Sequence, residues 1–444
     1  MQLSKHNIIS KLVNSDKYFI VNLLSQNADI LDVDQYQRLI NGEAITDIEC
    51  MEKGYVVDQK EELKLFKNKY LEFLDSRDSD EIQLFFVPTY ACNFSCTYCY
   101  QDEYLNKILV PNKNIIHSFF QYIDLHFSER NKYVTIFGGE PLLDGKNHYE
   151  FLKLFIAEAN KRNLDLAIVT NGYHLESYID LLKMASIREI QVTLDGVGEK
   201  HDARRPLKNG QPTFKKIVKG IDLALNAKFP LNLRMVIDKN NVGELPSLAK
   251  FAIEKGWTKN ELFKSQLGRN YELHHCQVDS DKLYTRLGMY QDIYKLLSEH
   301  PEILEFHKPA FSISKFLFEE GKLPNALFDS CPATKTEWAF DYTGKIYSCT
   351  ATVGKTGEEL GTFFPEVFLD EDKLSEWEER DILSIAECAD CSVQLACGGG
   401  CGSVAKNSNG KICSPDCRPV KELLEYGLSY YFASEINQTI TDKN

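Results

Sequence analysis

The chain of 444 residues is long enough for two or three domains, because one hydrophobic core rarely serves a chain of this length. Hydrophobic residues make up 43% and charged residues 26%, a soluble globular composition, and no apolar run is long enough to cross a bilayer. The net charge of −14 argues against a nucleic-acid partner, although local basic grooves stay compatible with it. The N-terminus lacks the basic-then-apolar order of a secretory signal, so we expect a cytoplasmic protein with no nucleic-acid or membrane partner.

Residues 1–80 have the pattern of a small α/β unit. The pattern predicts strands at 18–24, 28–31 and 55–57, a turn at 25–27, a short helix capped by Asp32 or Asp34 and ending at Ile40, and a charged helix over 61–74. The unit stands ahead of the motifs described below. It is therefore either a docking element or a packing extension that closes one end of the next domain, and both interpretations stay open.

From Ile82 onward, short apolar runs alternate with amphipathic helices, which predicts βα units around a parallel sheet. Strands are expected at 82–87, 133–137, 164–169, 189–194, 231–237 and 262–266, with helices between them at, for example, 115–127, 149–159 and 214–227. The predicted fold is α/β, a partial (β/α)6 TIM-like barrel in which functional residues gather at the carboxyl ends of the strands. The barrel is expected over 81–300, followed by a helical bridge (301–330), a cysteine-rich domain (331–418) and a C-terminal helix (419–444).

Three cysteines, Cys92, Cys96 and Cys99, share one short loop directly after the first predicted barrel strand. Thiolates at the unequal spacing C-x3-C-x2-C can hold one cubane iron–sulfur cluster and leave its fourth iron without a protein ligand. A zinc knuckle and a disulfide staple are the alternatives. Zinc needs four ligands and no histidine lies nearby, while an odd number of cysteines cannot all pair. Thirteen cysteines in a chain expected in the cytoplasm also favour metal over disulfides.

The C-x3-C-x2-C spacing resembles the signature of the radical S-adenosylmethionine (SAM) enzymes. In that family the amino and carboxylate groups of SAM chelate the open iron, and an electron from the [4Fe–4S] cluster splits SAM into methionine and a 5′-deoxyadenosyl radical. The turn Gly138-Gly139-Glu140, which ends the second predicted strand, resembles the family's element that holds the methionyl amine. The resemblance implies SAM as cofactor and a small electron donor, such as flavodoxin or ferredoxin, as a partner.

Polar residues also end the next two predicted strands, where Thr170 and Asn171 close the third strand and Thr193 closes the fourth. The resemblance implies that Tyr98 lies along the adenine, that Thr193 contacts the ribose or methionyl end, and that Arg205 helps to hold the SAM carboxylate. A strand-end turn or a surface ion pair is the alternative for each of them. The sequence assigns no catalytic residue.

A second set of cysteines follows downstream: Cys331, Cys349, Cys388, Cys391, Cys397, Cys401, Cys413 and Cys417. Two C-x2-C pairs are enough for a zinc ribbon, and seven or eight thiolates exceed what one zinc needs. The array resembles the SPASM domain, the C-terminal extension of radical SAM enzymes that modify peptides and proteins. It implies two auxiliary [4Fe–4S] clusters, hence three clusters in all. Two structural zinc ions are the alternative.

By position in the resembling domain, one group of four cysteines holds the distal cluster and one group of three holds the cluster nearer the active site. The distal group is Cys388, Cys391, Cys397 and Cys417, and the proximal group is Cys331, Cys349 and Cys401. The fourth proximal place falls either to Cys413, which makes a closed electron relay, or to no cysteine, which leaves an iron for a substrate group. A single short loop that reaches both clusters is demanding, so the open site is favoured slightly.

Two substrate classes compete within this group: ribosomally made precursor peptides that are cross-linked or otherwise oxidised, and sulfatases matured by formylglycine formation. In the sulfatase-maturating branch an aspartate base follows the cysteine at the position of Cys349, whereas here Thr350 follows it. The N-terminal unit resembles the leader-recognition modules of peptide maturases in element order, which also favours the peptide. An iron–sulfur electron carrier is the third hypothesis, against which the open three-cysteine site argues. Four other residues are expected in the core or in loops: Cys50, Cys276, His274 and His275.

Overall fold

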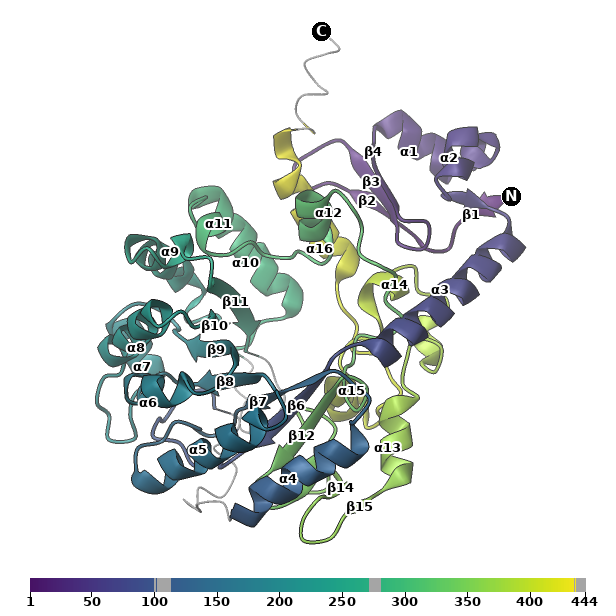
Figure 1. Ribbon diagram of the computed structural model, residues 1–444. Helices are drawn as coiled ribbons and strands as arrows, with labels where there is room; N and C mark the ends of the chain where they lie inside the picture. The colour runs from purple at the N-terminus through teal and green to yellow at the C-terminus, as the bar shows by residue number, and fades with distance from the viewer. Residues whose placement is uncertain (100, 102–112, 271–280, 435, 437–444) are drawn as a thin grey trace.

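The computed structural model describes residues 1–99, 101, 113–270, 281–434 and 436 of the chain, and Cys276, His274 and His275 lie outside this part. The barrel occupies one side of the molecule and the N-terminal unit the other, with the long helix α3 (Gln59–Ser79) running between them (Figure 1). The cysteine-rich segment lies between the two, so it contacts both.

A ten-stranded sheet forms the centre of the molecule, with the strand order β11-β10-β9-β8-β7-β6-β12-β13-β14-β15. Strands β6 to β11 are parallel and come from successive βα units. Their bounds are Ile82–Val87 (β6), Lys132–Ile136 (β7), Leu166–Thr170 (β8), Ile187–Thr193 (β9), Leu231–Ile237 (β10) and Phe263–Arg269 (β11). The predicted α/β fold with a partial barrel is therefore confirmed.

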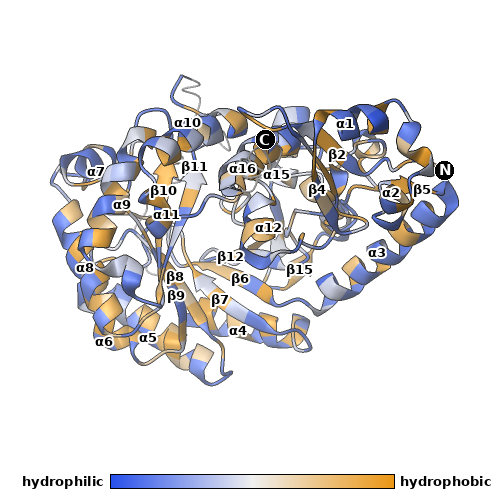
Figure 2. Ribbon diagram, turned by 90° about the horizontal axis from the view of Figure 1, so that it is seen from above, coloured by the Kyte–Doolittle hydropathy of each residue, from blue (hydrophilic) through white to orange (hydrophobic). Residues whose placement is uncertain are grey.

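Amphipathic helices cover the outside of the barrel: α4 (Lys113–His126), α5 (Lys146–Asn160), α6 (Leu175–Leu182), α7 (Glu199–Arg204), α8 (Phe214–Asn226) and α9 (Leu245–Glu254), with short 3-10 turns η3 (Val242–Glu244) and η4 (Trp257–Lys259). Hydrophobic residues are concentrated in strands such as β6 and β10, whereas the helices carry both kinds (Figure 2). In the core, the ring of Phe86 on β6 packs against Phe119 of α4 and Phe155 of α5, with centroids 4.8 and 5.1 Å apart. Burial of the apolar faces of the helices against the sheet holds the strands in place. The ends of these strands carry the site.

The cysteine-rich segment contributes strands that the sequence analysis does not predict. Strand β12 (Glu337–Asp341) pairs in parallel with β6, and β13 (Lys345–Tyr347), β14 (Glu359–Thr362) and β15 (Phe368–Leu369) continue the sheet in antiparallel order. These strands are two to five residues long, too short for a clear alternation of polar and apolar residues. Because β12 extends the barrel sheet, the loop after β13, which carries Cys349, is held beside the barrel.

The N-terminal unit contains two strands more than predicted, β1 and β2. Strands β2 (Asn7–Lys11), β3 (Tyr18–Asn22) and β4 (Asn27–Leu31) form an antiparallel sheet, while β1 (Gln2–Leu3) pairs with β5 (Val56–Val57). The helices are α1 (Val33–Ile40), α2 (Ile48–Glu52) and the 3-10 turn η1 (Glu43–Thr46). Asp32 caps α1 in a capping box with Gln35, as one of the two predicted alternatives has it. Cys50 lies partly buried on α2.

The N-terminal unit shares a hydrophobic core with the C-terminal part of the chain. The shared core joins Ile8, Phe19, Val21, Leu23 and Leu24 to Phe328, Ile385, Leu395, Val420 and Leu424. The ring of Phe328 contacts Phe66, Tyr70 and Phe73 of α3, with centroids 5.1 to 5.6 Å apart. The unit is thus packed against the rest of the molecule, and peptide docking by it stays a prediction.

The remaining helices follow the barrel: α10 (Arg286–Glu299), α11 (Ile303–Phe306), α12 (Ser314–Glu320), α13 (Glu371–Glu378), the 3-10 turn η6 (Ala386–Cys388), α14 (Gln394–Cys397), α15 (Gly402–Asn409) and α16 (Val420–Tyr431). Within the described ranges, no helix combines the length and the apolar character needed to cross a membrane. The domain boundaries given above stay predictions.

Candidate functional site

The loop after β6 faces a cavity at the carboxyl ends of the parallel strands. Cys92, Cys96 and Cys99 all line this cavity, whose volume is about 460 Å³, within the range of roughly 300–1,000 Å³ of cofactor sites. Of the predicted site residues, those that line the same cavity are Tyr98, Gly138, Gly139, Thr170, Asn171, Thr193 and Arg205. Glu140 is buried, with 1% of its surface exposed. Residues far apart in sequence therefore meet at one place, as the spacing of the motifs predicts.

The environment of Cys92 suits a metal-bound thiolate. Its Sγ accepts hydrogen bonds from the backbone N–H of Phe94 (3.4 Å) and from Nδ2 of Asn171 (3.9 Å). Burial, and after it the nearby Glu140 carboxylate, raises the pKa of the Cys92 thiol to about 12, so a thiolate here needs a cationic partner at neutral pH. The irons of a cluster would supply that positive charge, and the three thiols of this loop fit one.

The glycine turn after β7 locks onto the cysteine loop through backbone contacts. Gly138 and Gly139 have φ values of +91° and +47°, and a Cβ at Gly139 would lie 2.3 Å from the carbonyl oxygen of Ala91. The N–H of Glu140 donates to that same oxygen at 2.9 Å. The N–H of Gly139 donates to Oε1 of Gln101 at 2.6 Å. Only glycine allows the two segments to approach this closely.

The Glu140 carboxylate binds to the protein itself. Oε1 accepts from the N–H of Leu142 (2.8 Å) and the hydroxyl of Thr170 (2.6 Å), and Oε2 accepts from the N–H of Asn171 (2.6 Å). Burial raises its pKa from the usual 4.5 to about 7 despite these hydrogen bonds. Glu140 therefore ties the glycine turn to the end of β8, and the cavity wall at this point consists of Gly138 and Gly139.

A polar network continues the wall across the ends of β9 and β10. The hydroxyl of Tyr98 donates to Oδ2 of Asp195 at 2.5 Å, and Nη1 of Arg205 donates to the Tyr98 oxygen at 2.6 Å. Asp195 is fully buried and also accepts from the N–H of Val236 at 2.9 Å. Arg204 lies within 3.5 Å of the same carboxylate. The network holds Tyr98 and Arg205 in one orientation at the cavity.

Sequence reasoning assigned no binding role to Asp195, Arg204 or Gln101. Asp195 carries a detectable signal, because a carboxylate directly after a barrel strand lies at the functional end of the barrel. Arg204 is next to Arg205 in the chain, but only the fold shows that its guanidinium reaches Asp195 and Asp238. Gln101 follows the cysteine loop, and no spacing rule predicts its bond to Gly139.

The downstream cysteines fall into the two predicted groups. Burial raises the pKa of the Cys349 thiol, and the carboxylate of Glu337 and the thiols of Cys331 and Cys401 raise it further. Burial raises the pKa of the Cys388 thiol to about 11, with contributions from its other three group members: Cys397, Cys391 and Cys417. Such mutual effects require the thiols to be close. The members of each group are therefore neighbours, and which of them bind iron stays a prediction.

A buried charged network fixes the loops between these cysteines. Arg380, with no exposed surface, donates to the carbonyl oxygens of Ile412 (2.9 Å), Gly399 (2.7 Å) and Ser414 (3.2 Å). Lys335 is paired with Asp329 and donates to the carbonyl oxygen of Arg380 at 2.7 Å. The Arg380 side chain thus joins the loop just before Cys401 to the loop that carries Cys413.

No three His, Cys, Asp or Glu side chains among the described residues converge as a single metal ion requires. A cubane cluster distributes its thiolates over separate irons, so this observation concerns single ions. Thr350 and Ala351, which follow Cys349, line the cavity of Cys92, Cys96 and Cys99. The segment that follows Cys349 and the cysteine loop therefore border the same space.

Residues 86–252 match the family model of the Radical SAM superfamily. This segment, 167 of the 444 residues, resembles a radical SAM domain. GTP 3′,8-cyclase of Nautilia profundicola is 31% identical over 173 residues, which are 38% of this chain and 52% of that protein. GTP 3′,8-cyclase of Helicobacter pylori is 29% identical over 242 residues, 52% of this chain and 68% of that protein. The chain spans about half the length of the first of these curated relatives.

Two groups of solved structures share the fold over most of the chain. Native anSMEcpe with bound AdoMet and Cp18Cys peptide is 21% identical, with a TM-score of 0.61 over 81% of this chain and all of that one. Streptococcus suis SuiB is 14% identical, with a TM-score of 0.54 over 95% of this chain and 99% of that one. SuiB has also been solved bound to the precursor peptide SuiA. At 21% and 14% identity these likenesses establish the fold alone.

Proposed function

We propose that this protein is a radical SAM peptide maturase, which binds SAM at the cluster of Cys92, Cys96 and Cys99 and oxidatively cross-links a ribosomally synthesised precursor peptide. When bound, the cluster and SAM supply a 5′-deoxyadenosyl radical that takes hydrogen from unactivated carbon. The chain itself orients SAM, excludes water from the site and positions the substrate. The contact of Thr350 and Ala351 with the cavity of the cysteine loop carries this proposal.

The residues of the cavity have distinct roles in this proposal. Gly138 and Gly139 present backbone atoms to the methionyl amine, and Thr193 and Arg205 face the rest of SAM. The bond from Arg205 to Tyr98 and the bond from Tyr98 to Asp195 restrict both side chains before any ligand arrives. Such preorganisation lowers the entropic cost of binding.

The downstream cysteines would hold two auxiliary clusters, so that the loaded protein contains about twelve irons, four per cubane. Oxidative cross-linking removes one more electron from the substrate than hydrogen abstraction does, and clusters beside the cavity could take it. A small electron donor, flavodoxin or ferredoxin, would reduce the cluster of the cysteine loop. If Cys413 is no ligand, a Cys413→Ala protein keeps its iron content and spectrum. Loss of one cluster in that variant would assign Cys413 to the proximal group.

The sulfatase-maturating alternative is disfavoured by Thr350, because this cavity-lining position carries no titratable side chain. The N–H of Thr350 donates to the Glu337 carboxylate at 2.7 Å. An electron carrier would have no use for a cavity of about 460 Å³ beside its thiols. A cyclase acting on GTP is favoured by the sequence likeness alone, which covers 38% of this chain for the Nautilia protein.

The test is a reaction of the reduced, reconstituted enzyme with SAM and the peptides encoded beside its gene. We expect one peptide to lose the mass of two hydrogen atoms, with one 5′-deoxyadenosine formed for each event. GTP in place of peptide is the control. If 5′-deoxyadenosine forms and every such peptide stays unchanged while GTP is consumed, the proposal is wrong and the cyclase alternative is right.

A further inference from the structure

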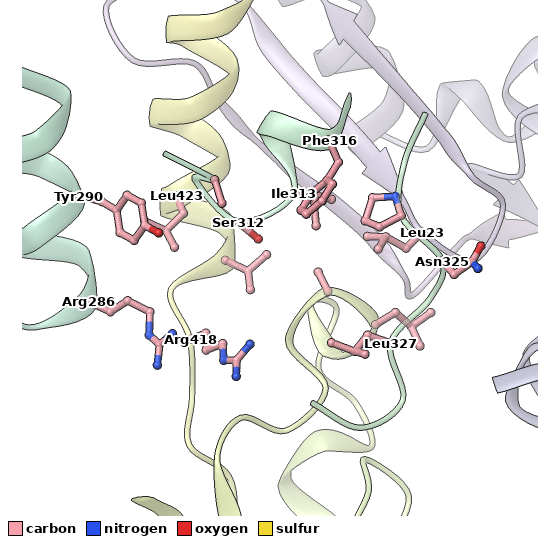
Figure 3. Close-up of a pocket in the computed structure, with 15 residues that line it drawn as sticks. Leu23, Arg286, Tyr290, Ser312, Ile313, Phe316, Asn325, Leu327, Arg418 and Leu423 are labelled. Atoms are coloured by element: carbon pink, nitrogen blue, oxygen red, sulfur yellow. The ribbon is translucent and has the colours of Figure 1, made fainter. Parts of the chain in front are cut away.

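A second cavity lies away from the barrel, where three parts of the chain meet (Figure 3). Its wall comes from the end of β3 in the N-terminal unit, from helices α10 and α12 with the chain near them, and from α14 and the start of α16. Figure 3 shows Arg286 and Arg418 side by side at one end, and Leu23, Ile313 and Phe316 toward the other. The cavity therefore has a cationic end and an apolar end.

The cationic end has more positive charge than its surroundings neutralise. Nε of Arg418 is buried without a hydrogen-bond partner, and the nearest counter-charge of Arg286 is Asp416 at 3.8 Å. Burial raises the pKa of the Tyr290 hydroxyl while Arg286 and Arg418 oppose the rise, which places both guanidinium groups near this ring. In a chain of net charge −14, two neighbouring arginines, of which only Arg286 has a carboxylate of a described residue within 4 Å, form a local anion site.

The apolar end has room for a side chain. The cavity volume is about 300 Å³, about twice the ~150 Å³ that holds a benzene molecule in a dry cavity. Its apolar wall consists of Leu23, Ala310, Ile313, Phe316, Pro324, Leu327, Leu395, Ala396, Val420 and Leu423. One aliphatic or aromatic group together with a carboxylate would fill this space.

The backbone at the edge of the cavity is strained. Phe311 and Ser312 have φ values of +40° and +60°, and neither is a glycine, so each residue costs about 1–2 kcal/mol in this left-handed region. Ser312 lines the cavity. Strain of this kind persists where the surrounding structure imposes it, and it is concentrated at binding sites. It is an observation independent of the two arginines.

We propose that this cavity binds the precursor peptide outside the active site, and that it takes an apolar side chain next to an Asp or Glu carboxylate of that peptide. The inference rests on the proposed function, because a peptide is the ligand that must also reach the cavity of the cysteine loop. A peptide is favoured over a lipid because Leu23 continues directly from β3, in the unit predicted to recognise the peptide. The carboxylate pairs with the guanidinium groups of Arg286 and Arg418.

The test uses two dipeptide probes, acetyl-Leu-Glu-amide and acetyl-Leu-Gln-amide, titrated calorimetrically into the reconstituted full-length enzyme. We expect the Glu probe to bind about tenfold more tightly than the Gln probe, since it alone makes charge-assisted hydrogen bonds. Arg286→Gln and Arg418→Gln should each abolish this difference. Lys295→Gln, on the same helix α10 and with 72% of its side chain exposed, should preserve it.

Several outcomes would overturn the inference: equal affinity of the two probes, no heat with either probe, or an unchanged difference in Arg286→Gln. Tighter binding of decanoate than of either dipeptide would identify a lipid site instead. Measurements of iron content and thermal unfolding identify a variant that fails to fold. In that case the comparison of the two probes on the wild-type protein still tests whether the cavity prefers a carboxylate. If the enzyme modifies its peptide but the probes bind equally, this inference fails and the proposed function stands.

Discussion

Replacing Gly139 by alanine should force the glycine turn away from the cysteine loop. The new Cβ would lie 2.3 Å from the carbonyl oxygen of Ala91, 2.7 Å from the carbonyl carbon of Tyr90 and 2.8 Å from the carbonyl oxygen of Thr89. Carbon and oxygen normally stay about 3.3 Å or more apart, and backbone atoms cannot rotate away. One segment must therefore move by about 1 Å, and a misplacement of about 1 Å costs about 10²-fold in rate.

We expect 5′-deoxyadenosine formation by Gly139→Ala, measured chromatographically in the reduced and reconstituted enzyme, to fall by about 10²-fold. Gly256→Ala is the matched control, because Gly256 also has a positive φ, +72°, but a Cβ there meets nothing within 4 Å. Both variants have the same type of left-handed strain, about 1–2 kcal/mol, and only one has the clash. If both retain equal rates at equal iron content, the backbone contact does not position the site and the reasoning is refuted.

Three further predictions concern the clusters, a buried histidine and the N-terminal unit. Changing Cys331 and Cys349 to alanine should remove about four of about twelve irons in a colorimetric assay, and unchanged iron would argue for zinc or for no cluster. Burial, and next Lys5, lowers the pKa of His6 from its usual 6.5 to about 4, so the folded state should lose stability as pH falls below about 6.5, by roughly 2 kcal/mol at pH 5. His6→Phe should remove this loss, so its melting temperature should exceed that of the wild type by more at pH 5 than at pH 7.5, and an equal gap at both pH values would contradict the assignment. Ile30 and Val33 are exposed apolar residues of the N-terminal unit, at 38% and 43%. Serine at both positions should weaken peptide binding several-fold in fluorescence anisotropy, and unchanged affinity would show that the surface around these two residues does not dock the peptide.

Strands β6, β8 and β10 of the barrel were predictable because they are buried on both faces and are flanked by turn residues. Strands β6 and β10 begin and end at the predicted residues, Ile82–Val87 and Leu231–Ile237. The short strands of the cysteine-rich segment were not predictable, since the pairing of β12 with β6 joins residues about 250 positions apart and leaves little local pattern. The core that the N-terminal unit shares with the C-terminal part of the chain was not predictable either, because it also joins distant segments.

The candidate site, too, was predictable from the sequence only in part. Cysteine spacing indicated the cysteine loop, and the family resemblance pointed to the glycine turn and to Thr193 and Arg205, which line the cavity. The part played by Glu140 could not be read from the sequence, because its hydrogen bonds to Thr170 and the N–H of Asn171 depend on where β8 ends. Buried charges such as Arg380 are also invisible to motif reasoning, because carbonyl oxygens from three separate positions surround it.

The central claim is that Cys92, Cys96 and Cys99 hold the cluster at which SAM is cleaved. The most direct measurement compares the wild-type protein with a variant in which all three are alanine, each reconstituted with iron and sulfide, reduced and given SAM without peptide. We expect the wild type to release 5′-deoxyadenosine, and the variant to release none while losing about four irons and keeping the rest. Continued release of 5′-deoxyadenosine by the triple variant, or an unchanged iron content, would contradict the claim.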